Sequence, residues 1–168
     1  MAIRNIRKGE DEVLRAKCKP VPEVTDGVRR LIGDMFDTLY AAQGVGLAAP
    51  QIGIVKRIVV IDDYDGHRYA LINPVIVSRE GEQLSNEGCL SLPGYHGQVR
   101  RPQRVLVKAL DEAGKEITIQ GEGFLAVILC HEIDHLDGIL YKDVAEVYTV
   151  LEDAGEGRTQ KNGKRPGR

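Results

Sequence analysis

Two histidines and a glutamate fall within one HExxH stretch, with His131 and His135 four positions apart and Glu132 between them. On a helix, side chains four residues apart lie on one face, so both imidazoles can bind the same metal ion. Glu132 is rotated from His131 by about 100° and still borders that site, where it can reach a metal-bound water. The pattern indicates a hydrolytic metal centre, and the third protein ligand decides its class.

The segment that carries this motif is apolar nearly all round, from residue 123 to residue 136. A helix with that profile is buried in the centre of a domain. Burying three polar groups there without a partner would cost several kcal/mol, so a bound metal is the economical explanation. Asp134, on the same helix, is turned away from His135 and is expected to support the site or the packing of the helix.

The residues around the motif leave more than one candidate for the third ligand. Metzincin-type zinc proteases place a third histidine six residues after the second, but Tyr141 occupies that position here. A thermolysin-like site needs a downstream glutamate, and the nearest ones, Glu146 and Glu152, stand outside any predicted helix. Cys89 is the better candidate, because a metal deprotonates a thiol outright and binds the thiolate strongly.

The cysteines Cys18, Cys89 and Cys130 are odd in number and widely spaced, which is not the pattern of a disulfide framework. Cys130 precedes His131 and projects about 100° to one side of it, so it cannot share the metal. We expect Cys130 to be a small buried hydrophobe, and Cys18 to be the same or a surface thiol. This cysteine usage fits a reducing cytoplasm.

Composition predicts a soluble globular protein. With 168 residues, 42% hydrophobic and 29% charged, the chain suits a single catalytic domain over residues 1–153. A net charge of −2 gives no reason to expect a nucleic-acid binder, and the chain shows neither a secretory signal nor an apolar run that could span a membrane. Residues 154–168 carry five basic side chains against one acidic and are predicted to be a disordered basic tail.

Periodicity predicts the other elements. Apolar side chains at helical spacing after a capping Thr25 or Asp26 predict a helix that runs to about Ala42. A short helix over 11–16, strands over 57–61 and 69–77, and an antiparallel hairpin over 105–110 and 115–120 complete the pattern. Because helices and strands do not alternate regularly, we expect an α+β fold, with mostly antiparallel sheets packed around the central buried helix that carries HExxH.

A glycine-rich apolar segment covers residues 44–53 and suits neither a helix nor a solvated loop. Glycine lets a backbone come close to another backbone or to a ligand. The segment is therefore either a tight connection packed on the core or part of a site, and its composition does not separate the two.

Three motifs stand in order along the chain: GVGLAAPQ at residues 44–51, EGCLS at residues 87–91 and HEIDHLDG at residues 131–138. In this order and spacing they closely resemble peptide deformylase, whose pattern reads GxGLAAxQ, EGCLS and QHExDHLxG. The resemblance also covers the N-terminal segment and extends to about residue 145. One position departs, since Cys130 stands where the family most often has glutamine.

The resemblance implies that Cys89, His131 and His135 bind the metal. It implies ferrous iron, with zinc, nickel or cobalt as other occupants, and zinc also suits one sulfur and two nitrogens by general coordination rules. The implied reaction removes the formyl group from the N-terminal formyl-methionine of newly made polypeptides and releases formate. A metal-bound water would attack the formyl carbon, while Glu132 accepts its proton and delivers it to the leaving amine.

Contacts with the substrate also follow from the resemblance. The Gln51 side-chain amide and the Leu90 backbone N–H would stabilise the developing oxyanion. The positions of His96, Arg100 and Arg101 after the cysteine motif suggest that they border the substrate groove, without fixing a role. The residues expected to bind the peptide by strand addition, or to line the methionine pocket, are Gly44, Val45, Gly46, Val127 and Ile128.

The implied partners are N-formyl-methionyl nascent peptides. We expect a cytoplasmic monomer, whose basic tail could contact the ribosome transiently. No membrane and no sequence-specific nucleic acid are expected. Two other functions are kept as alternatives: a zincin-type metallopeptidase with an acidic third ligand, and a non-catalytic metal-binding protein. Glu132 argues against the second, because it supplies a general base beside the metal.

Overall fold

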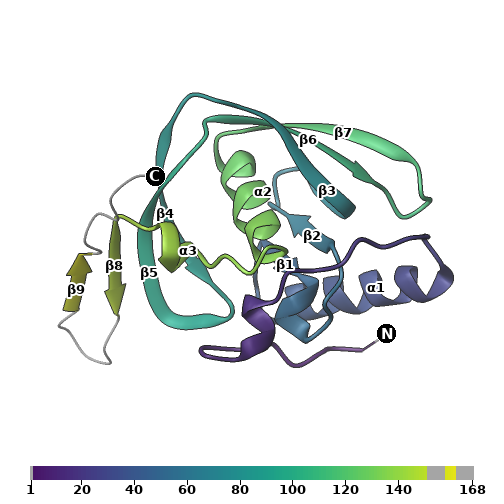
Figure 1. Ribbon diagram of the computed structural model, residues 1–168, viewed down its shortest axis with the longest axis horizontal. Helices are drawn as coiled ribbons and strands as arrows, with labels where there is room; N and C mark the ends of the chain where they lie inside the picture. Colours follow the sequence, from purple (N-terminus) through teal and green to yellow (C-terminus); the bar gives the residue numbers. More distant parts are fainter. Residues whose placement is uncertain (1, 151–157, 162–168) are drawn as a thin grey trace.

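The computed structural model describes residues 2–150 and 158–161 of the chain. One helix, α2, lies between two antiparallel sheets (Figure 1). The helical elements are η1 (Glu12–Arg15), α1 (Asp26–Ala41), η2 (Ala49–Ile52), α2 (Phe124–His135) and α3 (Tyr141–Val144). The strands are β1 (Gly46–Ala48), β2 (Ile58–Asp62), β3 (Arg68–Glu80), β4 (Gln83–Cys89), β5 (Leu92–Arg101), β6 (Arg104–Leu110), β7 (Glu116–Glu122), β8 (Val147–Val150) and β9 (Arg158–Lys161).

The strands of the described residues form a larger sheet in the order β1-β2-β3-β6-β7 and a smaller sheet in the order β4-β5-β8-β9. Each pairing between neighbouring strands is antiparallel. The predicted α+β fold with mostly antiparallel sheets is therefore confirmed. β1 and β4 each stand at the edge of a sheet, where a strand presents unpaired backbone groups.

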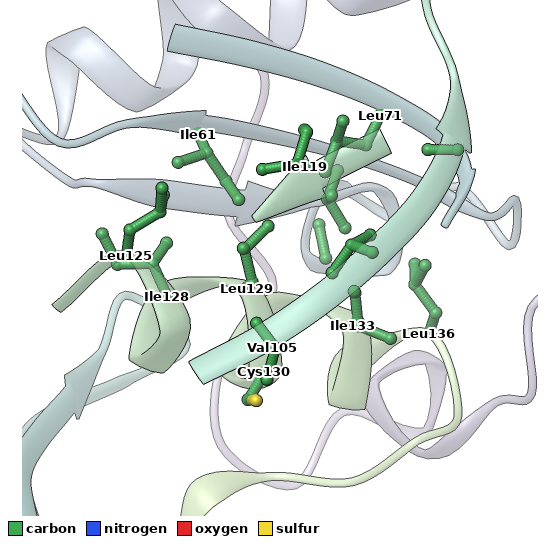
Figure 2. Packing of buried hydrophobic residues seen from close by; sticks show 14 of the residues in the cluster. Ile61, Leu71, Val105, Ile119, Leu125, Ile128, Leu129, Cys130, Ile133 and Leu136 are labelled. Carbon is green, nitrogen blue, oxygen red and sulfur yellow. The ribbon is translucent and has the colours of Figure 1, made fainter. Parts of the chain in front are cut away.

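One face of α2 packs on the larger sheet and forms the main core (Figure 2). Leu125, Leu129 and Ile133, at helical spacing, share one buried cluster with Ile61 of β2 and Val107 of β6. Each aliphatic side chain of this kind contributes about 1.5–3 kcal/mol when it is fully buried. The helix that carries the HExxH motif is thus held by close aliphatic packing along its whole length.

The other face of the larger sheet is covered by α1. Alternate side chains of β2 point to opposite faces, so Val59 and Ile61 join the cluster of α2 while Ile58 and Val60 join the cluster of α1. The predicted start of α1 is confirmed, because the Thr25 hydroxyl accepts a hydrogen bond from the Val28 N–H at 3.3 Å. The buried apolar positions of α1 are Val28, Ile32, Met35, Phe36 and Leu39.

Two features of the smaller sheet were not predicted. β4 carries polar side chains on both faces, so no alternation marks it, and pairing with β5 holds its backbone. Arg158–Lys161, which fall within the predicted tail, pair with β8 as β9. A ladder of backbone hydrogen bonds forms there without any need for apolar periodicity. The predicted tail residues 154–157 and 162–168 lie outside the described residues.

Candidate metal centre and substrate cleft

The strand β4 ends at Cys89, and this thiol meets two histidines of α2. The ligand atoms of Cys89, His131 and His135 all lie within 4.8 Å of one another, and the Cys89 Sγ is 3.4 Å from the His135 Nε2. A tetrahedral ion with bonds of about 2.0–2.3 Å would hold such atoms about 3.3–3.8 Å apart. The separation of the Cys89 Sγ and the His135 Nε2 falls in this range, and one sulfur with two imidazole nitrogens suits a soft or borderline divalent metal.

A buried ion-pair network orients His131. The His131 Nδ1 lies 2.8 Å from the Glu87 Oε1, and Glu87 also accepts hydrogen bonds from the Arg101 guanidinium at 2.8 and 2.9 Å. Burial raises the pKa of Glu87, but the bonds from Arg101 and His131 outweigh it and lower the pKa to about 2. An ionised Glu87 can only accept, so His131 donates from Nδ1 and keeps Nε2 for a metal.

The same network includes Arg101 and Asp134, whereas Arg100 and His96 make separate contacts. Arg101 is only 6% exposed and donates a further hydrogen bond to Asp134 at 2.8 Å. Arg100 forms an ion pair with Glu146, and the His96 Nδ1 lies 3.3 Å from Asn86. None of Arg100, Arg101 and His96 lines the cleft described below, because their side chains are taken up by these other contacts.

Glu132 lies in the cleft wall with its carboxylate buried. Its Oε1 is 4.0 Å from the His131 Nε2, and its Oε2 has no hydrogen-bond partner among the described residues. Burial raises the pKa of this carboxyl to about 7. β1 passes close by, since a Cβ on Gly46 would lie 2.6 Å from the Glu132 Oε1. Only glycine allows this approach of strand and carboxylate.

Burial keeps His135 and the two core cysteines in their neutral forms. Burial lowers the pKa of His135 well below its ordinary value, which favours the metal-binding imidazole. Cys18 and Cys130 are buried in the main core, and burial raises the pKa of each thiol to about 11. Both cysteines lie outside the metal cluster and behave as small hydrophobes.

Gln51 of η2 joins the edge strand to the cysteine. Its Oε1 accepts a hydrogen bond from the Ala48 N–H at 2.9 Å, and its Nε2 donates to the Ser91 Oγ at 3.1 Å. The same Nε2 lies 3.5 Å from the Cys89 Sγ. These contacts fix the amide with its NH₂ group beside the metal cluster. Leu90 follows the cysteine in the turn between β4 and β5 and lines the same cleft.

A cleft of about 660 Å³ is lined by residues from β1, β4, β5 and α2. The five residues that the sequence predicted for substrate binding all line it: Gly44, Val45, Gly46, Val127 and Ile128. Ser85, Asn86, Tyr95 and Phe124 also line it and were missed. The first two belong to the unpredicted β4. Phe124 was counted within an all-round apolar helix, although it is 58% exposed at the first position of α2.

Residues 3–149 match the family model described as polypeptide deformylase. The chain belongs to this family. The peptide deformylase of Acetivibrio thermocellus is 52% identical over 165 residues, which cover 98% of this chain and 95% of that relative. The peptide deformylase of Thermoanaerobacter pseudethanolicus is 56% identical over 145 residues, which cover 86% and 91%.

Solved structures of the family share the fold. A peptide deformylase from Legionella pneumophila is 50% identical with a TM-score of 0.83, covering 85% of this chain and 86% of that one. The enzyme from Synechococcus elongatus, solved in complex with actinonin, is 40% identical with a TM-score of 0.82 and covers 85% and 79%. The resemblance drawn from the three motifs is therefore confirmed. Among the described residues, no helix combines the length and apolar character needed to cross a membrane.

Proposed function

We propose that this protein is a metal-dependent amide hydrolase that removes the formyl group from the N-terminal formyl-methionine of newly made polypeptides. The observation that carries the proposal is the cluster of Cys89, His131 and His135 in a cleft at a strand edge, beside a Glu132 carboxylate whose Oε2 has no hydrogen-bond partner among the described residues. Membership of the deformylase family supports the same reaction. Residues 1–153 would form the catalytic domain.

The three clustered side chains would hold one divalent ion. When bound, the ion would polarise a water molecule and lower its pKa. Ferrous iron is the occupant that the family implies, and Zn²⁺, Ni²⁺ or Co²⁺ suit the same donors. Glu87 and Arg101 support this role, because they hold His131 in the tautomer that leaves Nε2 free.

Glu132 would act first as general base and then as general acid. Its free Oε2 can accept a proton from the water that attacks the formyl carbon. As the bond between the formyl carbon and the nitrogen breaks, the same carboxyl would deliver that proton to the leaving amine. The products are formate and a peptide with a free N-terminal methionine.

Two donors would stabilise the oxygen that becomes negatively charged during the attack. The Gln51 Nε2 is one, because Ala48 and Ser91 fix the amide beside the cysteine. The Leu90 backbone N–H, which follows that cysteine, is the other. Donors that are in place before the reaction stabilise charge that develops only in the transition state.

The peptide would lie extended along β1, against Gly44 and Gly46, by addition of a strand to the open edge. Val45, Val127 and Ile128 would line an apolar pocket for the methionine side chain. Its partners would be N-formyl-methionyl nascent chains in the cytoplasm, with the protein acting as a monomer that contacts the ribosome transiently.

The test compares formyl-Met-Ala with unformylated Met-Ala, using metal-loaded protein and measuring formate and free amino acids. Formate from the first peptide alone is the expected result. A zincin-type peptidase would instead cleave the unformylated peptide, but Glu146, a candidate acidic ligand for such a site, pairs with Arg100 and is outside the metal cluster. A non-catalytic metal-binding protein would release neither product.

A further inference from the structure

The edge strand β1 offers the cleft a short stretch of backbone. In its ladder with β2, the Asp62 N–H donates to the Val45 carbonyl at 2.9 Å. Alternate residues of an antiparallel strand bond to the neighbour, so the residues between them direct their N–H and C=O groups outward. Within β1, the residues that face the open side are Gly46 and Ala48.

Side chains cap this stretch at both ends. At one end, the Ala48 N–H donates to the Gln51 Oε1 at 2.9 Å. At the other end, Gly44 lines the cleft just before the strand, and its carbonyl accepts a hydrogen bond from the Tyr64 hydroxyl at 2.8 Å. Gly46 lies between the two caps and keeps its outward backbone groups for a peptide.

Tyr64 is held in place for this contact. It lies in the turn between β2 and β3 with a φ of 57°, a left-handed conformation that is costly for a tyrosine. The Tyr64 N–H donates to the Asp62 Oδ1 at 2.9 Å, and its ring lies 6.3 Å from the ring of Tyr40. The turn therefore presents an exposed tyrosine whose hydroxyl reaches back to the cleft wall.

We propose that Tyr64 limits main-chain recognition of the substrate to the first residues after the formyl group. The proposal rests on the proposed function. Gln51 places the metal cluster at the Ala48 end of β1, so a peptide with its formyl group there runs antiparallel to β1, past Gly46 toward Gly44. At Gly44 the Tyr64 hydroxyl already bonds the carbonyl that the next peptide N–H would use, so that N–H would have to share the oxygen with the tyrosine. Substrate residues further along the peptide would leave the cleft without a main-chain hydrogen bond to β1. This suits substrates whose sequences differ after the methionine.

The variant Tyr64→Phe frees this carbonyl and keeps the ring. The strand itself remains held, because the Gly44 N–H donates to the Leu39 carbonyl at 3.0 Å. We expect unchanged kcat/KM on formyl-Met-Ala and a two- to tenfold lower KM on formyl-Met-Ala-Ala-Ala. That factor corresponds to the net free energy of about one hydrogen bond. N-methylation of the peptide at its third or fourth residue, tried in turn, should abolish the gain at one of the two positions.

Tyr40→Phe is the matched control, since the Tyr40 hydroxyl donates to the Asp62 Oδ2 at 2.7 Å and does not contact Gly44. It should leave both peptides unchanged. An equal effect of Tyr64→Phe on both peptides, no effect on either, or a gain that survives both N-methylations would overturn the proposal. Failure of the wild-type protein to release formate from either peptide would instead overturn the proposed function, and no variant is needed to see it.

Discussion

The helix α2 is buried on two sides by different kinds of contact. Toward the larger sheet, side chains such as Leu129 pack among aliphatic neighbours, and this contact has no preferred direction. Toward the smaller sheet, His131 meets Cys89 and Glu87 of β4, and Arg101 of β5 completes the network. Truncation of a buried aliphatic side chain lowers the stability of the fold according to the volume removed. Removal of one partner of a buried ion pair instead leaves the other charge buried without compensation. Changes on the two sides should therefore have different consequences.

The largest effect is expected for Cys89→Ser on the polar side. A neutral hydroxyl is a poor substitute for a thiolate, so metal should be lost on dialysis and formate release should fall to background. Metal content by elemental analysis, beside activity, checks this. Cys130→Ser, on the same protein, should keep both. The opposite result, with metal lost only from the Cys130 variant, would show that the ligand assignment is wrong.

Glu132→Gln comes next. Because the residue is not a ligand, metal content should stay at the wild-type level while kcat falls by about 10²–10⁴-fold, the usual contribution of a general acid–base group. Steady-state kinetics and metal analysis on one preparation separate the two quantities. Parallel loss of metal and activity would make Glu132 a structural residue.

Leu129→Ala probes the aliphatic side of the same helix. The side chain is fully buried, so its truncation should lower the free energy of unfolding by about 2–5 kcal/mol. Metal content and kcat per folded molecule should not change. Urea denaturation gives the first quantity and kinetics the second, and a tenfold fall in kcat would remove the distinction between the two sides.

Glu87→Gln should have a smaller effect on the polar side. The amide oxygen can still accept from His131, but the charge opposite Arg101 is lost, and metal affinity should fall by about 10–100-fold. Competition with a chelator of known affinity measures it. Unchanged affinity would mean that the histidine needs no ionised partner.

The smallest effect is expected from removal of residues 155–168. This deletes β9, which pairs with β8 at the outer edge of the smaller sheet. Stability should fall by about 1 kcal/mol or less, with kcat/KM on formyl-Met-Ala unchanged. Thermal melting and kinetics check both, and a tenfold loss in kcat/KM would tie this edge to the cleft.

The same two sides differ in how far the sequence predicts them. The apolar face of α2, the hairpin of β6 and β7, and the Thr25 cap of α1 follow local rules of periodicity and capping, and each was predicted. Cys89 was chosen by its chemistry, without any strand to place it. The burial of Arg101 was missed, because its partners Glu87 and Asp134 are 14 and 33 residues away and only the folded sheet brings them together.

Tyr64 shows the same limit on a smaller scale. It lies between the predicted strands 57–61 and 69–77, and nothing local indicates that its hydroxyl contacts Gly44, 20 residues away. Contacts of this kind depend on the relative positions of two distant chain segments in the folded protein, and local patterns in a single sequence do not predict those positions. The cleft residues of β4 were missed for a related reason. Their side chains follow no apolar pattern that would predict a strand.

The metal cluster has a thermodynamic consequence. Cys89 and His135 are 46 residues apart in the chain, so the complete donor set exists only when β4 and α2 have come together. A metal would then bind the native state in preference to the unfolded chain, and would raise the free energy of unfolding by about 2.7 kcal/mol at one hundred times its Kd. The population of folded molecules in a cell would thereby depend on the free concentration of that metal.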